Sequence, residues 1–149
     1  MGSARRHAQL LWCAATDRTF ERAELKGEEV LAGKCIHCNC VVCVDLDGTR
    51  RLRATVEHIV PRTHGGSDTL ENLAIACGRC NGAKGIRHDP SPWGDPKLMA
   101  MIERLQERKR KRLREPLVGL TLPPLDAPGG DAEEAEEPAE KGKRKRKRR

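Results

Sequence analysis

Large aromatic side chains are almost absent from this chain of 149 residues. It has one Phe, two Trp and no Tyr, and aromatics make up 2% of the composition. A small domain with so little bulky apolar material seldom builds a sufficient core unaided, so we expect disulfides or a bound metal to staple it. The same shortage excludes a base-stacking platform for single-stranded nucleic acid.

Long apolar runs are missing as well. No segment approaches the roughly 20 apolar residues that a helix needs to cross a bilayer. The apolar stretch Leu10-Leu11-Trp12 follows Arg5 and Arg6, but it is too brief and too interrupted to resemble an export signal. We therefore expect no membrane contact and a reducing, cytoplasmic setting, in which thiols stay free or bind metals.

Cysteine is the residue type that supplies the staple. The chain has seven cysteines, an odd number that argues against a complete set of disulfides. Four of them form two Cys-x-x-Cys pairs, Cys35 with Cys38 and Cys77 with Cys80. This spacing lets two thiolates from each pair bind one tetrahedral ion, so we predict a closed, structural Zn²⁺ site.

A third pair, Cys40-Val-Val-Cys43, competes with the first for the metal. Cys35 and Cys38 are preferred because Gly33 and the short insert between the two cysteines suit a turn. Cys40 and Cys43 flank an apolar run, where a cysteine is more often a small core residue. His37, inside the first pair, is a remote substitute ligand.

Between and just after the cysteine pairs lie residues that suit phosphodiester hydrolysis. His58 suits a general base because histidine as a residue type changes charge near neutral pH, while Glu57 and Asn81 offer oxygen ligands to a hard ion such as Mg²⁺ or Mn²⁺. Asn72 is suited to fixing the loop and orienting His58. Because adjacent strand residues point to opposite sides, Glu57 and His58 share one site only if the strand ends or twists there, which Pro61 favours.

The order of these motifs resembles the HNH endonuclease family. The chain reads Cys-x-x-Cys, Glu-His-Ile-Val-Pro, Gly-Gly-Ser-Asp-x-Leu-Glu-Asn-Leu and Cys-x-x-Cys-Asn-x-x-Lys-Gly over roughly residues 20–88. The pattern is similar to the four-cysteine, zinc-containing branch found in phage and bacterial proteins. The resemblance implies a ββα-metal fold that grips one divalent ion, in a bacterium or a phage-infected host cell.

The resemblance also implies a role for each matching residue. His58 falls on the general base, Glu57 on the acidic metal ligand, Asn72 on the central asparagine and Lys84 on a basic position near the phosphate. Asn81 falls on the third position, usually a histidine that binds the metal, so the chain is an HNN variant. Glu57 is one methylene longer than the commoner aspartate.

We expect an α+β protein in four segments. Residues 1–19 form a helical segment, 20–90 the nuclease domain, 94–115 a basic amphipathic helix and 116–149 a disordered tail with an acidic and then a basic block. Within the nuclease domain, residues 20–32 suit a helix, and short strands flank a turn at residues 47–48. A further strand over residues 73–76 leads into a short helix, and Asp95 caps the last helix.

The charge of the chain indicates an anionic partner. Its formal net charge is +7 and its pI is about 9.2. We expect duplex DNA bound mainly through phosphates, with the basic run at residues 104–114 either tracking the backbone or simply solvated. The apolar stripe on residues 98–105 packs inside the chain or docks a protein partner.

The sequence thus predicts a metal-dependent DNA endonuclease, with His58 as base and a divalent ion at Glu57 and Asn81. Two alternatives remain open. One is a non-catalytic, zinc-stapled module that only binds nucleic acid. The other is a nuclease subunit, in packaging or repair, that is active only beside a partner.

Overall fold

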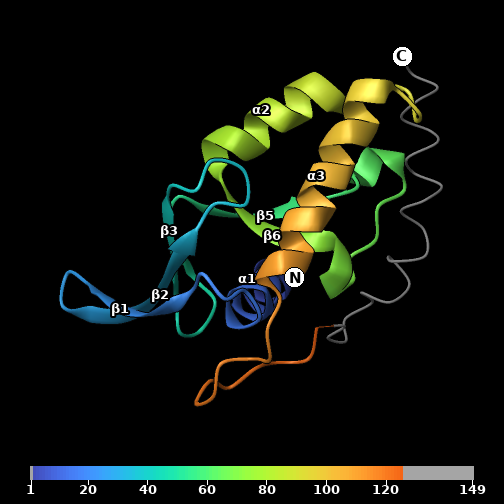
Figure 1. Ribbon diagram of the computed structural model, residues 1–149. Coiled ribbons are helices and arrows are strands. Elements are labelled where there is room, and N and C mark those ends of the chain that lie inside the picture. Colours follow the sequence, from blue (N-terminus) through green and yellow to red (C-terminus); the bar gives the residue numbers. More distant parts are fainter. Residues whose placement is uncertain (1, 126–149) are drawn as a thin grey trace.

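The computed structural model describes residues 2–125, in which helices pack around two antiparallel sheets (Figure 1). The larger sheet has the strand order β1-β2-β3-β4, and the smaller pairs β5 with β6. The strands are β1 (Glu21–Leu25), β2 (Glu28–Lys34), β3 (Val41–Asp45), β4 (Arg50–Leu52), β5 (Ala54–His58) and β6 (Leu73–Cys77). The helices are α1 (Gly2–Ala15), α2 (Gly78–His88) and α3 (Pro96–Arg112), with 3-10 turns at Arg62–His64 and Leu70–Asn72. The predicted α+β class is confirmed.

The β5, β6 and α2 elements form the ββα unit that carries most of the predicted site. β4 ends at Leu52, and the next residue, Arg53, has a φ of 60° in the left-handed region, which turns the chain out of the larger sheet. β5 then pairs with β6 along its whole length, from Ala54 opposite Cys77 to His58 opposite Leu73. β6 is buried throughout and runs directly into α2. The strand that holds His58 therefore lies beside the helix that holds Asn81.

The helix predicted over residues 20–32 is wrong, because this segment is the β1–β2 hairpin. Its turn consists of Lys26 and Gly27, with φ values of 53° and 81°. Two consecutive positive φ values favour a tight hairpin connection and are incompatible with a helix. β2 continues into the sheet by pairing with β3, where Gly33 lies against the ring of Phe20. A Cβ atom at Gly33 would lie 2.2 Å from that ring, which explains the glycine.

The core brings the two terminal helices together around the sheets. α1 contributes residues such as Leu10 and Leu11, which are 1% exposed. α3 begins at Asp95, whose side chain accepts a hydrogen bond from the Leu98 amide as predicted. The apolar stripe of α3 is buried in the same core, with Leu98, Met101, Ile102 and Leu105 each 6% exposed or less. A partner docking on that stripe is therefore excluded, because its side chains already pack inside the chain.

The chain after α3 turns back over α1. The Leu117 amide donates to Ala15 O at 3.0 Å, and Trp12 Nε1 donates to Pro123 O at 2.5 Å. The remainder of the predicted tail, residues 126–149, lies outside the described residues. Within residues 2–125, no helix is both long and apolar enough to span a membrane.

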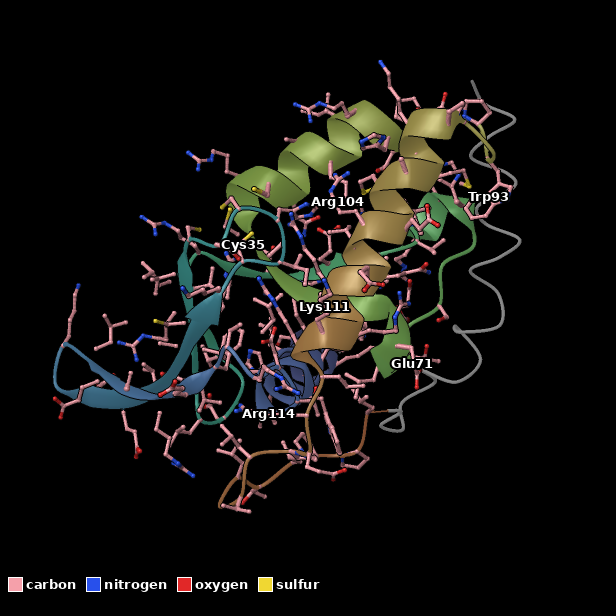
Figure 2. All side chains as sticks on the ribbon, viewed as in Figure 1. Cys35, Glu71, Trp93, Arg104, Lys111 and Arg114 are labelled. Atoms are coloured by element: carbon pink, nitrogen blue, oxygen red, sulfur yellow. The ribbon has the colours of Figure 1, made fainter. Side chains whose placement is uncertain are left out.

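The basic residues at the end of α3 hold the fold together. Arg108 Nη1 donates to Ile36 O and to His37 O, both at 2.8 Å. Arg114 Nη2 donates to Phe20 O at 2.7 Å, and Figure 2 shows this residue where the chain leaves α3 near α1. Arg112 bonds carbonyl groups of Lys34 and Cys35. These guanidinium groups satisfy buried or half-buried carbonyl oxygens, so they are not available to track a DNA backbone.

Arg108→Ala is expected to destabilise the protein by about 2 kcal/mol, because two charge-assisted hydrogen bonds to the first cysteine loop are lost. The measurement is the free energy of unfolding from urea denaturation. Arg104→Ala is the matched control, since Arg104 lies exposed on the same helix (Figure 2) and should cost less than about 0.5 kcal/mol. Equal losses of unfolding free energy from the two substitutions would show that the hydrogen bonds of Arg108 do not stabilise the fold.

Candidate metal centre and active-site cleft

The four predicted cysteines meet at one point. Cys35 and Cys38 come from the loop after β2, Cys77 ends β6 and Cys80 lies in the first turn of α2. One Sγ atom from each lies within 4.8 Å of the others, and Cys38 Sγ is 4.0 Å from Cys77 Sγ. Figure 2 shows sulfur atoms gathered near Cys35 at the start of α2. A tetrahedral zinc–thiolate site needs sulfur atoms about 3.8 Å apart, so this cluster can hold a metal such as zinc.

Backbone amides surround the sulfur atoms of the cluster. Cys35 Sγ accepts from the amides of His37 and Cys77, each at 3.3 Å, and Cys77 Sγ accepts from the Cys80 amide at 3.4 Å. Hydrogen bonds of this kind favour the thiolate. The pKa of the Cys38 thiol is lowered to about 6, chiefly by a hydrogen bond to the Cys40 backbone. The local structure thus favours the charged form that a metal requires at Cys38, while burial raises the pKa of the Cys80 thiol.

The competing ligands fall outside the cluster. Cys43 is 4% exposed on β3 and belongs to the core. Cys40 lies next to the cluster but is not one of the four cysteines whose sulfur atoms lie within 4.8 Å of one another. His37 points toward Glu57, with Nε2 3.2 Å from Oε2. The preference for Cys35, Cys38, Cys77 and Cys80 therefore agrees with the cluster that the structure forms.

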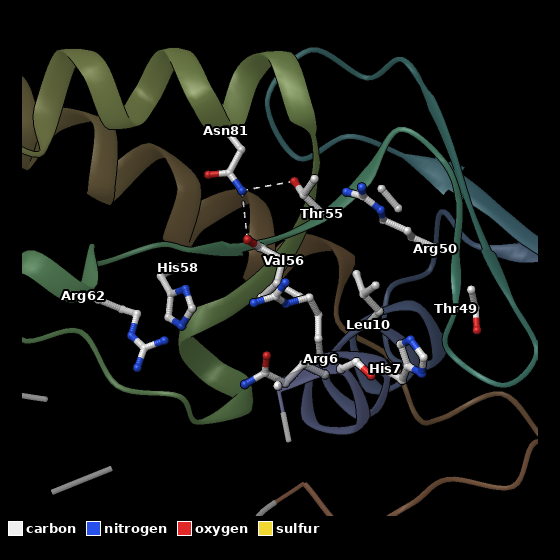
Figure 3. A pocket seen from close by; sticks show the side chains of 14 residues that line it. Arg6, His7, Leu10, Thr49, Arg50, Thr55, Val56, His58, Arg62 and Asn81 are labelled. Carbon is white, nitrogen blue, oxygen red and sulfur yellow. Dashed lines mark hydrogen bonds between the residues drawn. The ribbon is translucent and has the colours of Figure 1, made fainter. Parts of the chain in front are cut away.

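A cleft of about 800 Å³ opens where α1 faces β5 and the start of α2 (Figure 3). His58 and Asn81 both line it, together with three arginines, Arg6, Arg50 and Arg62. No aspartate or glutamate is among the 14 described residues that line the cleft. A cleft lined by three arginines and no carboxylate attracts anions.

His58 is held at the mouth of this cleft by a residue that sequence reasoning missed. His58 Nε2 lies 2.7 Å from Asp68 Oδ1, and the other oxygen of Asp68 accepts from Arg5 Nη2 at 2.5 Å. Asp68 lies in the Gly-Gly-Ser-Asp segment, ten residues after His58. The available signal was a carboxylate within the loop that follows a candidate base, a common partner for a catalytic histidine.

The charge of Asp68 sets the tautomer of His58. The pKa of Asp68 is lowered, first because of the hydrogen bond from His58 and further by the charges of Arg62 and Arg5, against the opposing effect of burial. An ionised carboxylate only accepts hydrogen bonds, so His58 Nε2 must carry the proton. Nδ1 is then the ring nitrogen that can accept a proton from water.

Asn72 fixes the loop that separates β5 from β6. Its Oδ1 accepts from the Val60 amide at 2.8 Å, and its Nδ2 donates to Val60 O and Ser67 O. Gly66 lies against the same structure, since a Cβ atom there would be 1.8 Å from Val60 O. The loop-fixing part of the predicted role thus agrees with these contacts, and the group that contacts the His58 ring is Asp68.

Glu57 lies on the side of β5 away from the cleft, as strand alternation requires. It is fully buried, and its Oε2 lies 2.6 Å from Lys84 Nζ and 3.2 Å from His37 Nε2. Both of its oxygens lack hydrogen bonds of good geometry within the described chain, although the distances to Lys84 and His37 are those of ion pairs. Lys84 Nζ also donates to His58 O, so this lysine joins the predicted base and the predicted ligand.

Asn81 faces the cleft from the first turns of α2. Its Nδ2 donates to Thr55 Oγ1 at 3.1 Å and to Val56 O at 2.9 Å, as the dashed lines in Figure 3 show. These bonds fix the amide against β5 and leave Oδ1 as the atom that can bind a ligand. His58 and Asn81 are thus brought together around one cleft, while Glu57 is held behind the strand.

Comparison with known proteins adds a family assignment for the centre of the chain. Residues 35–87 match the model of the HNH endonuclease family, from the first metal-binding cysteine to the end of α2. No curated protein and no solved structure matches the chain. The matched segment, about a third of the chain, contains the four-cysteine cluster, and its similarity to HNH endonucleases suggests nuclease activity. α1, the β1–β2 hairpin and α3 lie outside the match.

Proposed function

We propose that the protein is an HNH endonuclease that hydrolyses phosphodiester bonds in DNA. The observation that carries this proposal is the His58–Asp68 pair, which borders an arginine-lined cleft inside the segment that matches the family. A histidine with a carboxylate partner supplies a general base, and a cleft without carboxylates accepts a phosphate. Neither feature requires a partner protein to complete it.

In the proposed reaction, His58 Nδ1 takes a proton from the attacking water. The imidazolium that forms is stabilised by Asp68, which stays ionised and keeps the ring in one orientation. Arg62 lines the cleft beside His58 and is placed to neutralise charge on the phosphate (Figure 3). Lys84 acts on the structure of the site, because its hydrogen bond to His58 O holds the end of β5 against α2.

The proposed catalytic ion is Mg²⁺, Mn²⁺ or a similar divalent ion, with Glu57 and Asn81 as its proposed ligands. One ion could bind both only if the Glu57 side chain left its buried place behind β5, because Asn81 faces the cleft. The donor types fit, because a carboxylate and an amide oxygen suit a hard ion. The buried, unpartnered oxygen of Glu57 is a further observation that fits a cation at this side chain. When bound, the ion would supply Lewis-acid stabilisation of the phosphate. Binding requires Glu57 to exchange its contact with Lys84 for the ion.

Asp68→Asn is expected to lower the cleavage rate by roughly 10- to 100-fold, because an amide can donate to Nε2 and favour the wrong tautomer. The measurement is the single-turnover rate on a short duplex, together with ¹⁵N NMR of the His58 ring. The wild-type ring should carry its proton on Nε2, and the variant should lose that preference. An unchanged rate with an unchanged tautomer would show that Asp68 does not position His58.

The proposed function is tested by incubating the purified, zinc-loaded protein with duplex DNA, with and without Mg²⁺ or Mn²⁺. Cleavage that requires the added ion supports the proposal. Binding without cleavage would identify the protein as a non-catalytic nucleic-acid module. Cleavage that appears only with a cell extract would identify a partner-dependent nuclease.

A further inference from the structure

Two groups of basic residues in the chain differ in the contacts that their side chains make. Those at the end of α3 bond backbone carbonyl groups, as Arg108, Arg112 and Arg114 show. Those around the active-site cleft do not have such partners. Across residues 2–125, neither the Arg6 side chain nor the Arg62 side chain forms an ion pair or a hydrogen bond. The arginines that line the active-site cleft therefore leave positive charge beside His58 that a ligand can use.

A second cleft continues the first along β4 and the start of α2. It has a volume of about 650 Å³ and shares Arg50 and Thr55 with the active-site cleft. Its remaining lining includes Arg53 and Arg79, again with no aspartate or glutamate among the described lining residues. The two clefts together present what we call the arginine strip, made of Arg6, Arg50, Arg53, Arg62 and Arg79.

All five members of the arginine strip are exposed. Arg51 lines the second cleft too, but its guanidinium lies 2.7 Å from Glu28 and 2.8 Å from Asp45, so its charge is already neutralised. Arg5 precedes Arg6 on α1, yet it pairs with Asp68. Arg5 and Arg51 thus form internal ion pairs, while the arginines of the strip keep charge for a ligand; among them, Arg53 also donates to Val41 O at 3.4 Å.

We propose that the arginine strip binds the phosphate backbone of duplex DNA, with α1 as one wall of the groove. This inference rests on the proposed function, and it assigns substrate binding to Arg6 on α1, outside the family match, together with four arginines inside the match. Arg6 and Arg50 would hold phosphates between the one that reacts beside His58 and those at the start of α2. α1 then has two roles, because Arg5 supports Asp68 while Arg6 contacts the substrate.

The chemistry of the strip favours a duplex over a single strand. No Phe, Tyr or Trp is among the described residues that line either cleft, so unstacked bases find no aromatic platform. Guanidinium groups along a continuous strip match regularly spaced phosphates and read no base sequence. The protein should therefore bind duplexes of unrelated sequence with similar affinity and with a strong dependence on salt.

The test uses the full-length, zinc-loaded His58→Ala protein without added divalent ion, so that binding is measured without cleavage. A fluorescein-labelled duplex of about 20 base pairs is titrated at several salt concentrations, and the slope of log K against log salt is recorded. In this background, Arg6→Ala/Arg50→Ala should weaken binding roughly tenfold or more and reduce the slope by about 2. Lys97→Ala/Lys111→Ala removes the same charge from exposed positions on α3 and should change affinity by less than about twofold.

Each alternative outcome has one meaning, provided that both double variants keep the melting temperature of their parent. If both double variants weakened duplex binding equally, or if neither weakened it, the proposal that the arginine strip binds DNA would be wrong. Tighter binding of a single strand, lost in Arg6→Ala/Arg50→Ala, would overturn the choice of a duplex. The nuclease proposal is tested separately by wild-type cleavage, so a protein that binds through the strip without cutting would refute only the catalytic function.

Discussion

Replacing Cys77 with serine is expected to remove the metal and unfold the protein. Cys77 holds the cluster at the junction of β6 and α2, where its amide also bonds Cys35 Sγ. Structural zinc contributes about 10–16 kcal/mol in small zinc-binding peptides, while a whole domain is stable by only about 5–15 kcal/mol. Losing one of the four thiolates is therefore expected to cost more free energy than the whole net stability of a domain with so few aromatics.

Cys13 provides the matched control for this substitution. It is 2% exposed on α1, it lies outside the four-cysteine cluster, and burial raises the pKa of its thiol to about 11. Cys13→Ala should keep one zinc per chain by metal analysis and a native circular dichroism spectrum, with a small loss of stability. A Cys77→Ser protein with one bound zinc and a cooperative, wild-type melting transition would show that the cluster is not the staple.

His58→Ala is expected to lower the cleavage rate by roughly 10²- to 10⁴-fold, the usual contribution of a general base. The protein should stay folded, because the His58 side chain is half-buried at the edge of a cleft and not in the core. The rate is measured under single-turnover conditions on a short duplex, so that product release does not mask the chemical step.

Rescue by added imidazole distinguishes a missing base from a damaged site. Imidazole should restore part of the His58→Ala rate, with saturation, because the vacated space adjoins Asp68 and the cleft. The same concentrations should leave the wild-type rate unchanged. A folded His58→Ala protein that cuts as fast as the wild type would remove His58 from the mechanism and direct attention to other groups along the cleft.

The local chemistry of the site could be predicted from sequence because its motifs are short and spaced. Two Cys-x-x-Cys pairs define a metal cluster by ligand type and separation alone, and Asp95 followed by Pro96 marks the start of α3. Strand alternation also predicts that Glu57 and His58 face opposite sides of β5. In the structure the two side chains do face opposite sides: Glu57 pairs with Lys84 behind the strand, and His58 lines the cleft.

Other features depend on backbone conformations and on tertiary contacts that the sequence pattern does not show. The sequence predicts a helix where the β1–β2 hairpin lies because Lys26 adopts a left-handed backbone conformation, and lysine as a residue type does not indicate this conformation. The charged run on α3 was open to two interpretations because its roles depend on carbonyl groups up to 100 residues away, such as Ala14 O for Arg114. Asp68 was missed as the partner of His58 for the same reason, since a loop must fold back to join them.

The most direct test of the central claim is supercoiled plasmid cleavage by the purified, zinc-loaded protein, with Mg²⁺ or Mn²⁺ against metal-free buffer. His58→Ala and Cys13→Ala serve as the inactive and active controls. We predict that nicked or linear DNA appears only with added metal, with wild type and Cys13→Ala but not with His58→Ala. A folded, zinc-loaded wild-type protein that leaves the plasmid intact under all these conditions would contradict the proposal that this protein is a DNA endonuclease.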